Sequence, residues 1–214
     1  ADNSSIAATS PDGITWTQRA LPSSAQWYSV AYGNNTFVAV AYGPSNKAAT
    51  SPDGITWTAR TMPSSAAWTS VTYGNNLFVA VALGPSTTAA SSPDGVTWTA
   101  RTLPSSQHWQ SVTYGGGMFA AVSYTGTAAA SSPDGITWTA RTLPVSASWQ
   151  SVAYGNGIFV AIANSTSDAS AYSHDGITWS AKTLPVLSNW QAVSYGNGRF
   201  VAISTQGSNA ASAE

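Results

Sequence analysis

The chain contains no cysteine, few charged side chains and no long apolar run. Of its 214 residues only 7% are charged, and the net charge is −1. Without cysteine the chain can form neither a disulfide framework nor a cysteine-based metal site. A net charge this close to zero also lacks the basic footprint of a nucleic-acid-binding protein. No apolar run approaches the roughly 20 residues that a membrane-spanning helix needs, so we expect no membrane span.

The dominant feature of the chain is an internal repeat. Residues 10–17 read Ser-Pro-Asp-Gly-Ile-Thr-Trp-Thr, and the segment recurs at 51–58, 92–99, 132–139 and 173–180, with His174 in place of proline in the last copy. Its tryptophans follow one another at steps of 41, 41, 40 and 41 residues. Such a period is typical of solenoids, propellers and repeat arrays. Because the repeat covers nearly the whole chain, we expect one domain spanning residues 1–214.

The repeated segment predicts a tight turn between two strands. Pro11 presets its φ angle, Asp12 can bond its own backbone, and Gly13 accepts a positive φ. Asp-Gly between β-prone runs favours a two-residue hairpin. In the strand that follows, Ile14 and Trp16 are expected on one face. We therefore predict that the repeated tryptophans are buried between blades. They are Trp16, Trp57, Trp98, Trp138 and Trp179.

Each repeat contains four candidate strands. In one copy they are residues 27–32, the nearly continuous apolar run 37–41, the small residues 47–50, and 55–60. A Gly-Asn-Asn turn separates the first two. No segment has the 3.6-residue apolar period of a helix. Four short antiparallel strands in about 41 residues predict a β-propeller blade, and therefore an all-β fold.

Five copies of the repeat predict a five-bladed propeller. The chain starts with an outer pair of strands (6–19) and ends with an inner pair (190–204), so we expect one blade to be built from both termini and to close the ring. The third-strand pattern occurs six times for five places, because 6–9 and 209–212 compete for one. The short turn after 6–9 favours the N-terminal copy. Residues after Gly207 are therefore predicted to lie elsewhere.

The Ser-Pro-Asp-Gly-Ile-Thr-Trp segment resembles the Asp-box, or BNR-like, repeat of β-propellers. That pattern is roughly Ser/Thr-x-Asp-x-Gly-x-x-Trp, and here glycine follows aspartate directly, one residue short. In blade number and size the chain is similar to the tachylectin-like lectins. The two resemblances imply a propeller architecture and a carbohydrate-binding class.

A second set of tryptophans starts each inner strand after a polar loop. An aromatic surface flanked by amides and hydroxyls suits a sugar, whose C–H faces stack on the ring while its hydroxyls bond the polar rim. The alternative is that these tryptophans seal the interfaces between blades. The predicted ligand-binding residues are Trp27, Trp68, Trp109, Trp149, Trp190, Gln26, His108, Asn189, Gln110, Gln150 and Gln191.

Metal binding and catalysis are not expected. His108 and His174 have no second ligand at a metal-binding spacing, so we predict no metal and no cofactor. The Asp-box repeat is also familiar from sialidases, and that resemblance implies an arginine cluster, an acidic partner for a tyrosine nucleophile and an aspartate acid. Glu214 is the sole glutamate, and the arginines are spread one per repeat. Glycosidases usually need two carboxyls about 5–10 Å apart. We therefore predict that the chain is not an enzyme.

The function predicted from the sequence is multivalent carbohydrate binding by a monomeric lectin. Several weak sites on one propeller can raise the apparent affinity by roughly 10² to 10⁴. The expected partners are glycans or glycoconjugates on a cell surface. Since the surface should be mostly uncharged and polar, we expect a secreted or extracellular protein. Two alternatives stay open: a structural or adhesion module of a larger surface or phage-tail protein, and an engineered or recently amplified repeat without ligand.

Overall fold

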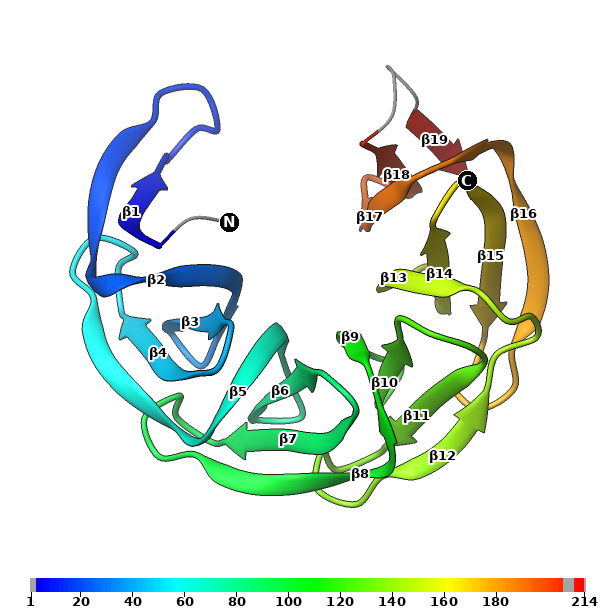
Figure 1. The fold of residues 1–214 in the computed structure, drawn as a ribbon. Helices are drawn as coiled ribbons and strands as arrows, with labels where there is room; N and C mark the ends of the chain where they lie inside the picture. Colours follow the sequence, from blue (N-terminus) through cyan, green and yellow to red (C-terminus); the bar gives the residue numbers. More distant parts are fainter. Residues whose placement is uncertain (1–2, 206–209, 214) are drawn as a thin grey trace.

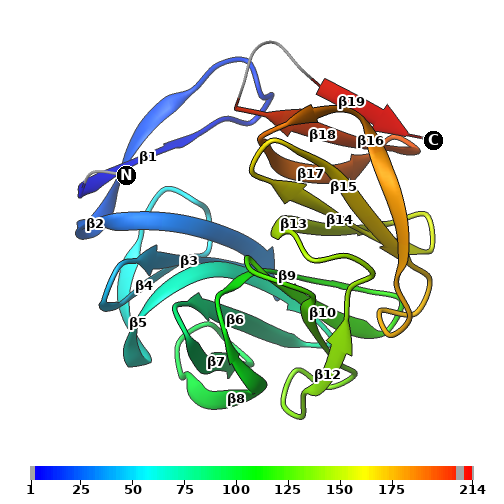
Figure 2. The same ribbon diagram turned by 45° about the vertical axis from the view of Figure 1, so that its right-hand side comes forward.

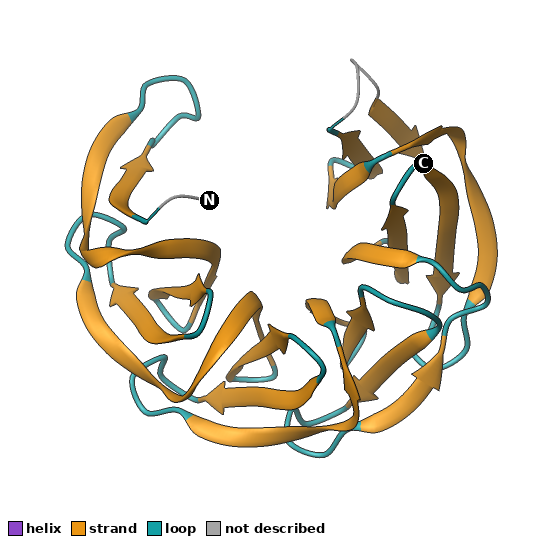
Figure 3. Ribbon diagram, viewed as in Figure 1, coloured by secondary structure: helices purple, strands orange, loops and turns teal. Residues whose placement is uncertain are grey.

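The structure is a computed structural model and describes residues 3–205 and 210–213. Within these residues the chain forms strands, turns and loops and contains no helix, which confirms the all-β prediction. The strands form antiparallel sheets that follow one another along an arc, as Figures 1 and 3 show. Two-residue turns such as Asn34-Asn35, with φ angles of 47° and 55°, connect the first and second strands of a blade.

Four blades are complete, and each has four strands. Strands β2 and β5 pass from the outer position of one blade to the inner position of the next. The first blade contains β2 (Thr17–Gly33), β3 (Thr36–Tyr42), β4 (Ser45–Ser51) and β5 (Thr58–Gly74). The second contains β5, β6 (Leu77–Leu83), β7 (Ser86–Ser92) and β8 (Thr99–Gln107). The third contains β9 (Trp109–Gly115), β10 (Met118–Ser123), β11 (Ala128–Ser132) and β12 (Thr139–Thr142). The fourth contains β13 (Ser148–Gly155), β14 (Ile158–Asn164), β15 (Ser167–Ser173) and β16 (Ser180–Ser188).

The sheets at the two ends of the arc are incomplete. At the N-terminal end β1 (Ser4–Thr9) pairs with the first half of β2 and forms an outer pair. At the C-terminal end β17 (Trp190–Gly196), β18 (Arg199–Ser204) and β19 (Ala210–Ala213) form a three-stranded sheet. Among the described residues the two end sheets share no strand pairing, and Figure 1 shows them apart. Figure 2 shows the three strands of the C-terminal sheet side by side. The prediction of five blades closed through both termini is therefore not met: the structure has four complete blades.

The reason is that β19 occupies the third-strand place on β18. Val201 pairs with Ser212 and Ala202 with Ala211, in the register that joins β3 and β4 in the first blade. The prediction that residues after Gly207 lie elsewhere is wrong for Ala210–Ala213, whereas Gly207 and Asn209 lie outside the described residues. Only a short connection joins β19 to β18, so its loop closure is local, whereas β1 would have to arrive from the far end of the chain.

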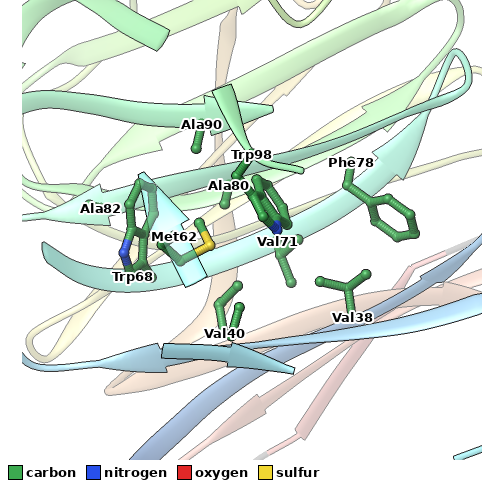
Figure 4. Close-up of a cluster of buried hydrophobic side chains, with 11 residues drawn as sticks. Val38, Val40, Met62, Trp68, Val71, Phe78, Ala80, Ala82, Ala90 and Trp98 are labelled. Atoms are coloured by element: carbon green, nitrogen blue, oxygen red, sulfur yellow. The ribbon is translucent and has the colours of Figure 1, made fainter. Parts of the chain in front are cut away.

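The hydrophobic core lies between successive blades. In Figure 4, Val38 and Val40 of β3 pack toward Trp68 and Val71 of β5, together with Phe78 of β6. Apolar residues therefore follow one another without alternation along the second strand of a blade, because both faces of that strand contact protein.

Candidate functional site

The aspartate of each repeated turn is bonded to its own loop. Asp94 Oδ1 accepts hydrogen bonds from Val96 N and Thr97 N at 2.8 and 2.9 Å. Ser92 Oγ donates to the same oxygen at 2.9 Å and accepts from Gly95 N at 2.8 Å. The equivalent bonds to aspartate recur in all five copies. The turns are structural, but they are loops such as residues 93–98 rather than two-residue hairpins.

These bonds lower the pKa of each turn carboxyl, because they favour its charged form. For Asp12 the backbone N–H groups of Thr15 and Ile14, followed by the Ser10 hydroxyl, lower the pKa to about 2. Backbone bonds are the largest cause at Asp53, Asp94 and Asp175. At Asp134 desolvation opposes the bonds, and the pKa is nevertheless lowered. Among the described residues, no three or more His, Asp or Glu side chains form a group that could hold a metal ion.

The outer tryptophans are buried in the interior of the arc. Trp98, Trp138 and Trp179 are 9%, 8% and 7% exposed, which confirms the prediction for these three. Trp57 is half-buried and Trp16, at the open end, is 63% exposed. The isoleucine or valine two positions earlier is exposed in every copy, so the prediction of a shared face is wrong. The alternation fails because these residues lie in the turn and the strand begins after the tryptophan. The exposed residues are Ile14, Ile55, Val96, Ile136 and Ile177.

The inner tryptophans face the protein interior. Trp68, Trp109, Trp149 and Trp190 have no exposed surface, and Trp27 is half-buried. Trp109 Nε1 donates to Ser105 O at 3.2 Å, and Trp149 Nε1 donates to Gly126 O at 3.1 Å. A ring packed on both faces cannot stack on a sugar. The four buried tryptophans therefore seal blade interfaces, as the alternative interpretation held, and the platform interpretation fails for them.

The residue after each inner tryptophan lies in a β-bulge, which the sequence pattern did not reveal. The pairing register shifts between Trp27 and Ser29, and it shifts at the same place in the other inner strands. A bulge redirects the side chain it carries. Gln110 Nε2 donates to Tyr28 OH at 3.4 Å across two blades, and Gln110 is buried. Thr69 Oγ1 likewise donates to Trp109 O of the next blade at 2.9 Å, so bulge side chains can contact other blades. The bulge residues are Tyr28, Thr69, Gln110, Gln150 and Gln191.

Two polar hollows lie where the loop between second and third strands meets the connection between blades. The first is lined by Thr125, Gly126, Ser146, Ala147, Ser148, Asn164, Ser165, Thr166 and Ser167. The second is lined by Asn3, Ser24, Ala25, Gln26, Tyr42, Gly43, Pro44, Ser45 and Lys47. They occupy equivalent positions of the repeat, on the face opposite the Gly-Asn turns.

The predicted site residues take different roles around these hollows. Gln26 lines the second hollow. Asn189 Oδ1 accepts from Thr166 N at 2.6 Å, and Gln191 Oε1 accepts from Asn164 Nδ2 at 3.2 Å, so both position the loop that borders the first hollow. The His108 carbonyl accepts from Tyr124 N at 2.7 Å, and the His108 and Gln150 side chains are half-buried. The sequence predicted a polar loop before each inner strand but did not assign Thr125, Ser146 or Ser165 as ligand residues.

The strand order and the blade interfaces define the chain as a β-propeller. Residues 63–184, more than half of the chain, match the DUF6242 β-propeller domain, and the chain belongs to that family. No curated protein matches the sequence. The described residues include no helix long and apolar enough to span a membrane.

Several solved structures share the fold. Streptogramin B lyase superposes with a TM-score of 0.83 at 12% identity, over 98% of this chain and 76% of that one. Virginiamycin B lyase from Staphylococcus aureus gives 0.81 at 11% identity, over 94% and 71%. YCF48 bound to a D1 peptide gives 0.68 at 18% identity, over 100% and 68%. At these identities the likeness concerns the fold alone.

The lyases correct one prediction. We argued from repetition and scarce carboxyls that the chain is not an enzyme, yet the same fold carries an enzyme in streptogramin B lyase. The argument considered hydrolases with paired carboxyls, and other chemistry does not need them. The comparisons support the propeller architecture, and they do not show the Asp-box or tachylectin resemblances.

Proposed function

We propose that this propeller binds carbohydrate in the polar hollows between its blades. The observation that supports this most directly is the first hollow, where the hydroxyls of Thr125, Ser146 and Thr166 gather without a charged side chain. Hydroxyl groups both donate and accept hydrogen bonds, as sugar hydroxyls do. The proposed ligand contacts are therefore loop residues that line the hollow, and no longer the buried tryptophans that the sequence suggested.

The rim of the first hollow is ordered before any ligand binds. Ser165 and Thr166 have positive φ angles of 71° and 51°, and Asn189 accepts a hydrogen bond from the Thr166 backbone. A loop fixed in advance loses less conformational entropy on binding. The second hollow lies at the equivalent repeat position, with Lys47 Nζ bonded to Ser24 O at 2.8 Å. Equivalent hollows on one molecule support multivalent binding to glycans on a cell surface, and hence an extracellular location.

A glycan array tests the proposal. Ser146 is exposed, and Ser146→Trp would fill the first hollow. We expect the array signal of this variant to fall by about tenfold, because losing one of several linked sites removes avidity. Thr137→Trp is the matched control, since Thr137 is an exposed turn residue at the other end of the third blade. The proposal fails if no glycan binds, or if both variants retain the wild-type signal.

A protein-binding or adhesion propeller is the second candidate. The two hollows differ in chemistry, with Tyr42 and Lys47 in one and small hydroxyl residues in the other, whereas identical sugar sites should resemble one another. A propeller of similar fold, YCF48, has been solved with a bound peptide. Absence of signal on the glycan array, together with peptide binding that Ser146→Trp weakens, would favour this candidate.

A further inference from the structure

Successive blades are joined by a repeated contact between a tyrosine and a glycine. The inner strand of each complete blade ends in glycine, and a Cβ atom there would lie 2.0 Å from a ring atom of the next blade's tyrosine. None of these glycines has a positive φ, so the backbone does not require glycine; the tyrosine ring above it does. The pairs are Gly33 and Tyr73, Gly74 and Tyr114, Gly115 and Tyr154, and Gly155 and Tyr195.

Each end of the arc carries one half of this contact. Gly196 ends β17, its φ is not positive, and nothing lies within 4 Å of where its Cβ would be. Tyr32, on β2, is 55% exposed. The ring centroids of Tyr32 and Phe37 are 4.6 Å apart, and those of the equivalent pair, Tyr73 and Phe78, are 4.7 Å apart. Tyr32 therefore already has the orientation of the paired tyrosines.

Valine and isoleucine side chains extend the same two surfaces. Val30 is 60% exposed, whereas its equivalent Val112 is buried against the preceding blade. At the other end Val201 and Ile203 are about half exposed, although the equivalent Val38 and Val40 are fully buried against the next blade. We call Val30 and Tyr32 the N-terminal face, and Gly196, Val201 and Ile203 the C-terminal face. The two faces have the residue types that meet at every interior blade interface.

We propose that the C-terminal face of one chain binds the N-terminal face of a second copy, head to tail, through the contact that joins successive blades. The ends of a single chain lie apart in Figure 1, and their sheets share no strand pairing in the described residues. The superposition on streptogramin B lyase covers 98% of this chain but 76% of the lyase chain. The arc therefore matches only part of a longer propeller, and its two ends do not meet.

When the shared blade forms, β1 of one copy and β19 of the other compete for a single third-strand position beside β18. In the separate chain β19 pairs with β18 and β1 pairs with β2. One of them is displaced when the shared blade forms, and the apolar contact between the faces does not depend on which. Because a head-to-tail contact uses two different surfaces, each bound copy keeps a free face, and rings or longer oligomers follow.

Light scattering after size-exclusion chromatography tests the proposal without any ligand. The wild-type chain should show a mass above its 22.0 kDa that rises with concentration. Tyr32→Asp disables the N-terminal face and Gly196→Trp the C-terminal face, so each variant alone should be monomeric. A mixture of the two retains one working face of each kind and should form a heterodimer of twice the chain mass. Ile136→Asp, at an exposed position away from both faces, should associate as the wild type does.

Circular dichroism melts check that the variants are folded. If Tyr32→Asp or Gly196→Trp is not folded, Val30→Asp and Val201→Asp replace them, since both valines are exposed. The proposal is overturned by a wild-type chain that stays monomeric at every concentration, by a mixture that stays monomeric, or by equal loss of association in Ile136→Asp. Carbohydrate binding is not involved in any of these measurements, so the two proposals fail independently.

Discussion

The interior blade interfaces and the ends of the arc contain the same residue types in opposite environments. Trp98 is 9% exposed and its equivalent Trp16 is 63% exposed, while Val112 is buried and its equivalent Val30 is exposed. Neither difference comes from the local sequence, which is nearly repeated. The core clusters contain residues of two successive blades, so the burial of a repeat depends on the blade beside it. The ends show which contributions to stability depend on a neighbouring blade.

The largest expected difference concerns the outer tryptophans. Trp98→Ala removes a buried indole and should lower the free energy of unfolding by roughly 3–5 kcal/mol. Trp16→Ala removes an exposed side chain and should lower it by less than about 1 kcal/mol. Both indoles donate to the carbonyl of the turn glycine, so the comparison is matched for that bond. Urea melts of both variants in the Tyr32→Asp background measure the difference without association. Equal losses would show that the neighbouring blade is not the source of the stability.

The comparison of ends and interior also separates what the sequence predicts from what it does not. Local chemistry predicted the four strands, the turn at Asn34-Asn35, the positive φ of Gly13, and the absence of helix in the described residues. It did not predict the bulge at Gln110 or the exposure of Ile136, because both depend on where the strand pairing begins. The open ends could not be predicted from strand counts, because β1 and β19 match the same third-strand position and a count does not decide between them.

The candidate site, too, could be predicted only in part from the sequence. Tryptophan at the start of an inner strand is compatible with a ligand platform or a sealed interface, and the sequence left both open. Trp149 is buried because the third blade, which precedes its own blade, covers it, and no pattern within one repeat reveals this contact. Residues such as Thr125 and Ser146 line a hollow because loops of adjacent blades meet there. The polar loop before each inner strand was the sequence signal nearest to them.

A smaller difference is expected at the strand-ending glycines. In Gly155→Ala the new methyl group would overlap the Tyr195 ring, and overpacking of this kind usually destabilises by about 1–3 kcal/mol. In Gly196→Ala the methyl group meets nothing within 4 Å, and the φ angle is compatible with alanine. The free energy of unfolding of that variant should not fall. Thermal melts at low protein concentration compare the two. A loss in Gly196→Ala as large as that in Gly155→Ala would mean that the ring of another residue already covers Gly196.

The third strand of the C-terminal sheet should contribute somewhat less. Ending the chain after Thr205 removes β19, which pairs with β18 and places Ala211 against the terminal core. A few backbone hydrogen bonds at a sheet edge contribute about 1–2 kcal/mol, and the melting temperature should fall by roughly 2–8 °C. The sequence alone predicted that residues after Gly207 lie elsewhere, in which case removing them should barely change the melting temperature. An unchanged melting temperature would restore that prediction and assign the place on β18 to β1.

The smallest effect, and the one that should not differ between ends and interior, is the pH dependence of the aspartate turns. The folded-state pKa of Asp12 is lowered to about 2 by bonds from Thr15, Ile14 and Ser10, and the pKa of Asp94 is lowered by the equivalent bonds. A lowered pKa stabilises the fold above the unfolded value near 4, and this contribution disappears as pH falls toward the folded pKa. Unfolding free energies measured between pH 5 and pH 2 should therefore decrease, and Asp12→Asn and Asp94→Asn should flatten the curve to a similar degree. The turn closes its bonds within its own loop, so the missing neighbour at the N-terminal end should not matter. If Asp94→Asn flattens the curve and Asp12→Asn leaves it unchanged, contacts between blades, rather than the turn itself, determine the pKa.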